Sequence, residues 1–552
     1  LKCCLGSRQP SAASAAPSLS HRAGCKKPKM SSQVEFEVPT DAQNRCVEFK
    51  PFKTIGGVIP YPHCGSSKQK NPHMRGFWAA TLAFMMAFIG WFAFAPLMVV
   101  VRKDIGLCDN DAEIQLDIEE VNVKCICGPQ CKETINQANI ASVLFDVFTR
   151  FILGAVVERM GPVNTDVMLL FWGALVVGCS AAITSGTGLI IVRFFVSALG
   201  STFVVNQFWN SILFAPNVIG TANATAGGWG NLGGGLTQTL MPLIYRMFHD
   251  GFGFSLSMSW RLSMAVPALI FIVLAVWIYT CTQDMSTGKF SVAALGKTKK
   301  ADCGQYLECL RDYRVVLMIF QYSACFGCEL VMNNKLAMHF ADYFDVDLVY
   351  AGVLAMSFGA MNLFARSLGG IASDWANVHW GMSGRLWMHF IALLGQAVFL
   401  FGFGCVDQQM GWSWALFMIV IMAIFVNAAE GTSYGIVPYM IPQHLAIVSA
   451  VVGAGGTAGS VIALTLFYRP AWVPDVLDQF KLHAAYVLFF ALTVPLMRWE
   501  HLGSMFGRPA AAIEAATEAK AAKAAEAAKV KDEPVKDSEV VLEETPARDT
   551  TV

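Results

Sequence analysis

The amino-acid sequence predicts an all-α polytopic membrane protein with twelve transmembrane helices. Of its 552 residues, 55% are hydrophobic and only 14% are charged, whereas ordinary soluble domains carry roughly 25% charged residues. The mean hydropathy of the chain is +0.48. The chain also contains about twelve apolar stretches near the ~20 residues that a helix needs to cross a bilayer. The charge deficit excludes a soluble protein of this length.

The apolar stretches divide the chain into two groups of six spans. The expected spans are 76–101, 136–157, 165–185, 188–214, 221–247, 260–282, 314–339, 348–371, 384–405, 412–440, 446–468 and 483–503. The resulting segments are an N-terminal segment (1–73), a first six-helix half (74–282), a linker (283–313), a second six-helix half (314–505) and a tail (506–552). Residues 1–29 lack the apolar region of a secretory signal. We expect Met30 to be the native start, with an organelle transit peptide as the alternative.

Lysine and arginine predict the orientation of the chain in the membrane. The segment that joins the sixth and seventh spans is basic, with Lys289, Lys297, Lys299, Lys300, Arg311 and Arg314. The loop after the first span is acidic instead, with Asp109, Asp111, Glu113, Asp117, Glu119 and Glu120. By the positive-inside rule, the linker and both termini are cytoplasmic. The equal totals of 40 basic and 40 acidic residues argue against a nucleic-acid partner.

Four cysteines lie in or beside this first external loop: Cys108, Cys125, Cys127 and Cys131. An oxidising compartment would allow them to form disulfides. Zinc ligation is the alternative, but the C-x-C-x3-C spacing lacks the usual pair of knuckles. We therefore expect disulfides, and no metal or cofactor.

Two motifs occur once in each half. An F-x-R-x3-G-x3-[ED] motif occupies 148–158 and 364–374, so its arginines are 366 − 150 = 216 residues apart. A G-x-G-x-x-[GA] motif occupies 228–233 and 453–458, at an offset of 453 − 228 = 225 residues. Similar offsets indicate one six-helix unit used twice. Two pseudo-symmetric halves of this kind are the arrangement of major facilitator transporters, whose substrate site lies between the halves near the bilayer midplane.

The glycine motif matches a dinucleotide-binding fingerprint, but its setting excludes that function. Both copies lie within apolar stretches of transmembrane length, where no parallel sheet can form. Gly230 and Gly234 are four residues apart, as are Gly455 and Gly459. Each pair predicts a small-residue stripe along which two helices pack closely. Packing alone leaves Asn231, a polar residue within the first stripe, unexplained.

Arg150 and Arg366 are the strongest candidates for a binding site. A mid-membrane arginine costs at least ~2.5–3.5 kcal/mol on insertion scales. Asp146 lies one turn before Arg150 and can pair with it, whereas Arg366 has no acid at i±3 or i±4. Two arginines at equivalent positions should face each other across the central cavity and favour an anion there. Guanidinium suits flat oxyanions because it forms paired hydrogen bonds; purely structural ion pairing is the alternative.

The stretches AGGWGNLGGGLTQ, MNLFARSLGG and NAAEGTSYGIVP resemble the nitrate/nitrite porters of the major facilitator superfamily, specifically the eukaryotic high-affinity nitrate transporters. VVGAGGTAGSV matches more loosely, and the resemblance covers roughly residues 74–505. It implies that Arg150 and Arg366 clamp nitrate, that Asn231 lies nearby and that aromatic rings, by local match Phe203 and Tyr322, sandwich the anion. Packing is the alternative role for both aromatics. The remaining substrate-binding candidates in the signatures are Gly230, Gly455 and Thr457, which stands where family members usually have asparagine.

The resemblance implies high-affinity uptake of nitrate, with nitrite as a second candidate substrate, across the plasma membrane for nitrate assimilation. Transport would be proton symport by alternating access, and many relatives need a small single-span accessory protein. Asp146, Glu329 and Glu430 are the intramembrane acids that could carry the proton. Glu430 has no basic residue at i±3 or i±4, so we expect it to be unpaired.

Charges at the predicted cytoplasmic ends of the second and eighth spans resemble the superfamily's gating loop. These are Glu158, Arg159 and Asp374; solvated loop charges are the alternative. His249, His339 and His444 lie near helix ends, where we expect contact with solvent. Two other functions stay open: nitrate/nitrite exchange without protons, and a nitrate receptor that signals through the C-terminal tail. No catalytic constellation favours an enzyme.

Overall fold

The computed structural model describes residues 36, 38–51, 71–108, 125–215, 218–288, 290–291, 303–441 and 444–507. Within these ranges, eleven helical segments are long and apolar enough to cross a membrane. The glycine-rich helix α9 (Ile219–Arg246), 28 residues long, accounts for the twelfth predicted span. The expectations for residues 1–29, for the acidic residues between 109 and 124, and for the tail beyond 507 lie outside the described residues.

The first half of the chain folds into helices separated by short turns. Its helices are α3 (Pro72–Phe92), α4 (Phe94–Asp104), α5 (Pro129–Met160), α6 (Pro162–Gly178), α7 (Gly186–Val196), α8 (Thr202–Leu213), α9 and α10 (Leu256–Cys281). The 3-10 turns η2 (Cys179–Ala182) and η3 (Ser197–Ser201) and the π turn η4 (Met247–Gly251) extend them. Asn71 starts α3, since its side chain accepts a hydrogen bond from the Met74 amide and Pro72 follows it.

The second half repeats this pattern. Its elements are α11 (Cys303–Arg311) in the linker, α12 (Tyr313–Asp342), α13 (Leu348–Ala360), η6 (Met361–Leu363), α14 (Ala365–Trp380), α15 (Met382–Phe403), α16 (Trp412–Ile436), η7 (Val437–Tyr439), α17 (Leu445–Leu466), α18 (Val476–Ala491) and η9 (Val494–Leu496). The antiparallel strands β1 (Arg498–Trp499) and β2 (Gly503–Ser504) follow. The predicted extension of the last span to residue 503 is therefore wrong, because helical structure ends at Leu496.

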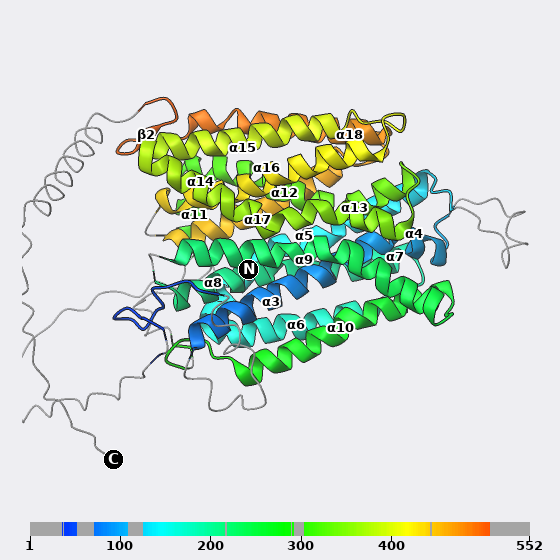
Figure 1. Ribbon diagram of the computed structural model, residues 1–552, viewed down its shortest axis with the longest axis horizontal. Helices are drawn as coiled ribbons and strands as arrows, with labels where there is room; N and C mark the ends of the chain where they lie inside the picture. The colour runs from blue at the N-terminus through cyan, green and yellow to red at the C-terminus, as the bar shows by residue number, and fades with distance from the viewer. Residues whose placement is uncertain are drawn as a thin grey trace, which may run out of the picture.

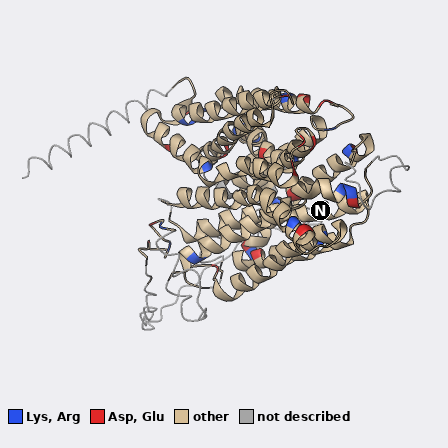
Figure 2. Cartoon of the chain, turned by 45° about the vertical axis from the view of Figure 1, so that its right-hand side comes forward, with Lys and Arg blue, Asp and Glu red and all other residues tan. Residues whose placement is uncertain are grey.

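The helices lie side by side along one direction, with the first half below and the second half above in Figure 1. Where the halves join, α5 packs on α17, and α9 packs on α13. Glycines allow this closeness, because a Cβ on Gly235 would lie 2.7 Å from the Cα of Gly359 in α13. Most of the bundle carries no charge (Figure 2), and large apolar side chains such as Val273 and Phe489 are exposed on its flanks. The chain is a multi-pass membrane protein.

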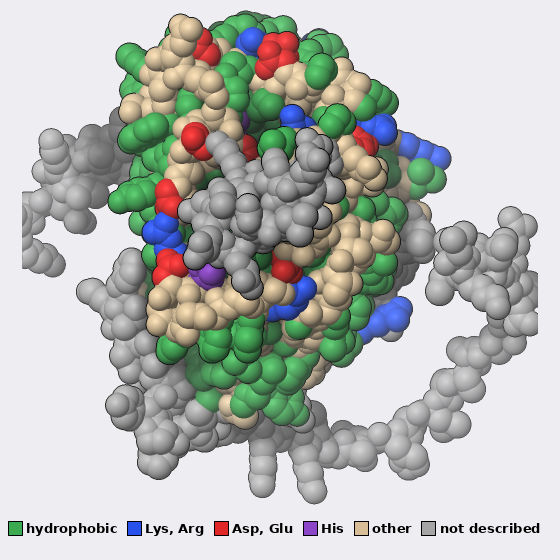
Figure 3. Space-filling model, turned by 90° about the vertical axis from the view of Figure 1, so that its right-hand side faces the viewer, with side chains coloured by type: hydrophobic (Ala, Val, Ile, Leu, Met, Phe, Trp, Pro, Cys, Tyr) green, Lys and Arg blue, Asp and Glu red, His purple; other side chains and the backbone are tan. Residues whose placement is uncertain are grey.

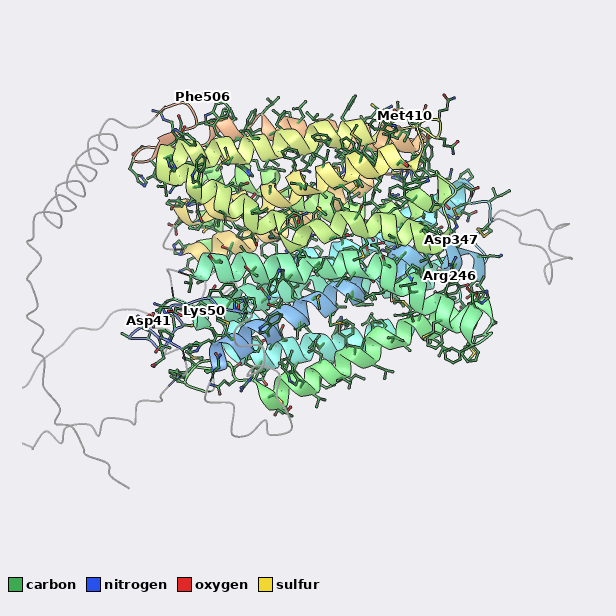
Figure 4. The ribbon with its side chains drawn as sticks, viewed as in Figure 1. Asp41, Lys50, Arg246, Asp347, Met410 and Phe506 are labelled. Carbon is green, nitrogen blue, oxygen red and sulfur yellow. A yellow bond between two sulfur atoms is a disulfide. The ribbon has the colours of Figure 1, made fainter. Side chains whose placement is uncertain are left out.

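Two disulfides mark one end of the bundle, which we call the disulfide end. Cys108 pairs with Cys125, and Cys127 pairs with Cys131. These pairings confirm the disulfide prediction and exclude the zinc alternative. Asp41, Lys50 and Phe506, near both limits of the described chain, lie at the opposite end (Figure 4).

Candidate functional site

The Arg150 guanidinium is buried where α5 meets η3 and α17. Its side chain is 1% exposed, and its Nε donates to Asp146 Oδ2 over 2.6 Å. Nη1 donates to the carbonyl of Gly453 over 3.2 Å, and Nη2 donates to the carbonyl of Gly200 over 3.3 Å. The ion pair with Asp146, expected from the spacing of one turn, is present. Because Gly453 belongs to the second half, Arg150 also joins the two halves.

Asp146 is held by hydroxyl groups as well as by Arg150. Ser201 Oγ donates to Asp146 Oδ1 over 2.8 Å, and Thr457 Oγ1 donates to Asp146 Oδ2 over 2.9 Å. Thr457 thus contacts the partner of Arg150 from across the interface between the halves. The carboxylate is fully buried, so these donors and the guanidinium replace the water it would otherwise bind.

Arg366 occupies the equivalent position in the second half, on α14. Its Nη1 donates to Glu430 Oε2 on α16 over 2.5 Å, and its Nη2 donates to the Tyr322 hydroxyl on α12 over 3.2 Å. The expectation that Glu430 is unpaired is wrong. The i±3 and i±4 positions report only on a residue's own helix, whereas Glu430 meets its cation on the neighbouring one. Its second oxygen, Oε1, is buried without a partner.

Both arginines face one aromatic ring. The Cζ atoms of Arg150 and Arg366 lie 5.5 Å and 5.9 Å from the ring centre of Phe203 on α8. The ring of Phe326 lies 5.2 Å from Arg150 Cζ and stacks on Tyr322. Tyr434 packs edge-on against both Phe203 and Tyr322, and its buried hydroxyl has no partner. The structure thus gathers two cations and two tyrosine hydroxyls around Phe203.

A second acid lies beside the Arg366 pair. Glu329 on α12 accepts a hydrogen bond from Asn231 Nδ2 over 3.1 Å and another from Asn362 Nδ2 over 2.8 Å. Its carboxyl group is an immediate electrostatic neighbour of Glu430. Asn231 therefore connects to Arg366 through two acids rather than by direct contact. This contact explains why a polar residue interrupts the first glycine stripe.

The two signature glycines fill packing positions. A Cβ on Gly230 would overlap the ring of Phe84, and one on Gly455 would lie 2.5 Å from Ile319 Cγ2. Among the described glycines, the one nearest the guanidinium group of Arg150 or Arg366 is Gly453, whose Cβ would lie 3.5 Å from Arg150 Nη1. Gly230 and Gly455 therefore lie at contacts between helices. Their nearest side chains are those of Phe84 and Ile319, and neither glycine lies beside a guanidinium group.

The gating candidates lie at the end opposite the disulfides. Asp374 is largely exposed and pairs with Arg385 Nη2 over 2.6 Å. Glu158 is half-buried and Arg159 is exposed at the end of α5. The structure does not bring these three residues to the arginine pair.

Three ion pairs join the two halves at the disulfide end. Arg102 on α4 binds Asp342 on α12 through two hydrogen bonds of 2.6 and 2.7 Å. Arg246 on α9 lies 2.5 Å from Asp347 (Figure 4). Glu133 on α5 lies 3.2 Å from Arg469, after α17. Together with the near-complete burial of Arg150 and Arg366, these pairs show the halves closed against each other at this end.

Sequence reasoning missed several residues of the site, chiefly Tyr434, Asn362, Phe326 and the carbonyl of Gly453. Tyr434 stands four residues after Glu430, which places both side chains on one face of α16. That spacing could have identified it. The other three reach the site through tertiary contacts that no local pattern encodes.

A family model described as the Major Facilitator Superfamily matches residues 70–464. The "High affinity nitrate transporter 2.5" of Arabidopsis thaliana is 32% identical over 436 residues, covering 79% of this chain and 78% of that protein. The "High-affinity nitrate transporter 2.3" of Oryza sativa subsp. japonica is 33% identical, covering 79% and 77%. A "Nitrate/nitrite transporter NrtP" of Picosynechococcus is 23% identical, covering 73% and 85%.

Solved structures share the fold. The crystal structure of a D-xylose-proton symporter matches with a TM-score of 0.54 at 13% identity, covering 78% of this chain and 99% of that one. An inward-facing, occupied bacterial homolog of the human lysosomal transporter Spinster matches with a TM-score of 0.55 at 12% identity, covering 77% and 97%. These matches support the arrangement of the helices alone.

Proposed function

This chain belongs to the Major Facilitator Superfamily, among its high-affinity nitrate transporters, and we propose that it carries nitrate into the cytoplasm by symport with protons. Nitrite is the second candidate substrate. One observation carries the proposal: a guanidinium from each half faces the same Phe203 ring, at 5.5 and 5.9 Å. Both arginines are almost fully buried, so an anion held between them would be shielded from water.

The polar groups around Phe203 suit a small planar oxyanion. Arg150 and Arg366 supply N–H donors in planar forks. The hydroxyl of Tyr434, which has no partner, can donate a further hydrogen bond. The aromatic rings of Phe203 and Phe326 offer flat, apolar walls. Nitrate, which is planar and weakly hydrated, fits such a mixture of donors and rings.

The charges of the site explain why protons would accompany the anion. Among the described residues, the cluster of charged side chains in the site contains two guanidinium groups, on Arg150 and Arg366, and three carboxyl groups, on Asp146, Glu329 and Glu430. With every group ionised the cluster carries one net negative charge, and nitrate would raise that to two. Uncompensated charge at this depth is costly. Two protons on the carboxyl groups would restore neutrality. Both would be released with nitrate on the cytoplasmic side, and the empty cluster would return with its carboxylates ionised, so we propose two protons per nitrate.

Glu430 is the acid best placed to take the first proton. Its Oε2 accepts a hydrogen bond from Arg366, but among the described residues its Oε1 has no partner. A proton on Glu430 would also remove the repulsion between its carboxylate and that of the neighbouring Glu329. Protonation of Glu430 would also weaken its hold on Arg366 and free that guanidinium for nitrate. Asp146 differs, because Arg150, Ser201 and Thr457 all donate to it and favour its charged form.

Alternating access would follow from opening the disulfide end. Disulfides form in oxidising surroundings, and the linker is basic, so we propose that the disulfide end faces outward and that both termini are cytoplasmic at the plasma membrane. The three ion pairs between the halves would break when the site opens outward. The opposite end would be closed by other charged residues in the outward-open state. These are the pair of Asp374 with Arg385, and Glu158 with Arg159.

Tracer uptake into proteoliposomes tests the proposal. An inward proton gradient should drive nitrate accumulation by the native protein but not by Arg150→Lys or Arg366→Lys reconstituted at equal density. Nitrate/nitrite exchange would instead require nitrite inside and ignore the proton gradient. A nitrate receptor would bind nitrate without accumulating it. Equal accumulation with and without the gradient would overturn the symport.

A further inference from the structure

A cavity of about 240 Å³ lies between the two halves at the disulfide end. One wall comes from α4 and α5 of the first half, with Arg102 and Lys132; the other comes from α12 and α18 of the second half, with Lys335 and His339. The cavity is several times the ~30 Å³ that one water molecule occupies in the liquid. It can therefore hold a small ion with part of its hydration shell. Figure 3 views this end of the molecule, over which both basic and acidic side chains are spread.

Lys335 brings a positive charge that no acid among the described residues balances. Its Nζ lies 5.6 Å from the ring centre of Tyr468, and among the described residues it has no hydrogen-bonded or ion-paired partner. Asp342, the acid that lines the same cavity, is already held by both terminal nitrogens of Arg102. Glu133, next to Lys132, pairs with Arg469. Counted over the described residues, the lysines therefore leave the cavity with excess positive charge.

His339 adds hydrogen-bonding capacity that no group in the described part of the chain uses. The residue is 6% exposed, and both of its ring nitrogens are buried without a partner. Its ring stacks on Tyr343 and meets Phe480 edge-on, with ring centres 5.2 and 5.1 Å away. The expectation that His339 contacts solvent is wrong, because α18 covers the end of α12. A buried imidazole lacking partners calls for a ligand in the cavity that it lines.

A further buried cation lies beyond Lys335 toward the centre of the bundle. Arg193 on α7 is 1% exposed, and it donates to the amide oxygens of Asn139 and Asn334 instead of to an acid. It is an electrostatic neighbour of Lys335. Lys335 itself follows Tyr322 by 335 − 322 = 13 residues on α12, which is about 20 Å at ~1.5 Å per residue. Positive groups thus continue from the cavity toward the arginine pair.

We propose that this cavity is a second anion site, which takes nitrate, or another small monovalent inorganic anion, on its path between the disulfide end and the arginine pair. The Lys335 ammonium and an N–H of His339 would hold the anion, and the aromatic ring beside them favours a weakly hydrated one. Both halves supply the walls, but Lys335 and His339, which would hold the anion, both lie on α12 and stay together when the disulfide end opens. The inference rests on the proposed nitrate transport and adds a binding step to it.

Calorimetric titration of the full-length protein in nanodiscs with sodium nitrate tests the second site. The native protein should show two nitrate sites, and Lys335→Gln should lose one of them while the other keeps its affinity. Arg366→Gln should lose the other site instead, so failure of the arginine clamp would be visible separately. Lys481→Gln is the matched control, because Lys481 lies at the same end but pairs with Asp478 outside the cavity.

Two further variants distinguish the loss of the site from misfolding of the protein. Lys335→Arg keeps the charge and should keep both sites, while His339→Leu should weaken the same site as Lys335→Gln without changing the melting temperature by more than the control does. In uptake assays, Lys335→Gln should raise KM about tenfold, a loss of about 1.4 kcal/mol, at an unchanged maximal rate. Two intact nitrate sites in a folded Lys335→Gln protein would overturn the proposal.

Discussion

Arg366 and Glu430 lie 64 residues apart in the chain, yet their side chains meet in a buried ion pair of 2.5 Å between α14 and α16. Removing one partner of such a pair leaves an uncompensated buried charge. The pair therefore links substrate binding to protonation: whatever neutralises Glu430 changes the partners available to Arg366.

Arg366→Lys should reduce nitrate uptake at least about tenfold, because a single ammonium cannot serve Glu430, Tyr322 and a planar anion together. The measurement is the KM and maximal rate of tracer uptake, normalised to protein at the membrane. Arg261→Lys is the control, since Arg261 pairs with Asp104 inside the first half. Near-native uptake by Arg366→Lys would remove Arg366 from the anion site.

Glu430→Gln should weaken the dependence of nitrate uptake on external pH, because glutamine imitates the protonated acid permanently and only the second proton is still taken up. Asp146→Asn should instead weaken nitrate affinity, since Arg150 loses its partner, and should keep the dependence on pH. Nitrate-evoked currents between about pH 5 and 8 distinguish the two variants. A full pH dependence in Glu430→Gln would assign the proton to another acid, with Glu329 the next to test.

Gly455→Ala should slow transport while leaving the protein at the membrane. The new Cβ would lie 2.5 Å from Ile319 Cγ2, so α17 and α12 would have to separate slightly. Gly220→Ala on α9 is the control, because a Cβ there would meet nothing within 4 Å. Equal turnover in both variants would show that the α12–α17 contact does not limit the cycle.

Breaking the ion pairs at the disulfide end should favour the outward-open state. Arg102→Gln should act more strongly than Arg246→Gln, since Arg102 is 5% exposed in its pair while Arg246 and Asp347 are 42% and 45% exposed and solvated pairs contribute little. The readout is labelling from outside of a cysteine introduced at Ser142, with the exposed Cys179 and Cys405 replaced by serine. No increase in labelling for Arg102→Gln would contradict this latch.

The sequence alone predicts the features that depend on local pattern. Hydropathy reveals the spans, the repeated motifs reveal the two halves, and the one-turn spacing reveals the pair of Asp146 with Arg150. Each of these predictions depends either on the geometry of a single helix or on the internal repeat of the sequence. The membrane makes these patterns strong, because every backbone polar group in it must be satisfied within a helix.

Features that depend on contacts between helices could not be predicted in this way. Glu430 looks unpaired within α16, and His339 looks solvated near the end of α12, until the neighbouring helices are placed. The end of the last span is a similar case: Trp499 is apolar and buried, but it belongs to β1, and its indole donates to the Tyr439 carbonyl over 2.7 Å. Trp499 is buried because the turn formed by β1 and β2 packs back on the helix bundle.

The central claim is that the cluster of two arginines and three acids takes up nitrate together with two protons. Simultaneous recording of charge and tracer nitrate in voltage-clamped cells tests it most directly. Two protons and one nitrate carry one net positive charge inward, so the account predicts about one positive charge per nitrate, and a lower ratio for Glu430→Gln. Nitrate entry with no net charge, or with net negative charge, would contradict the account.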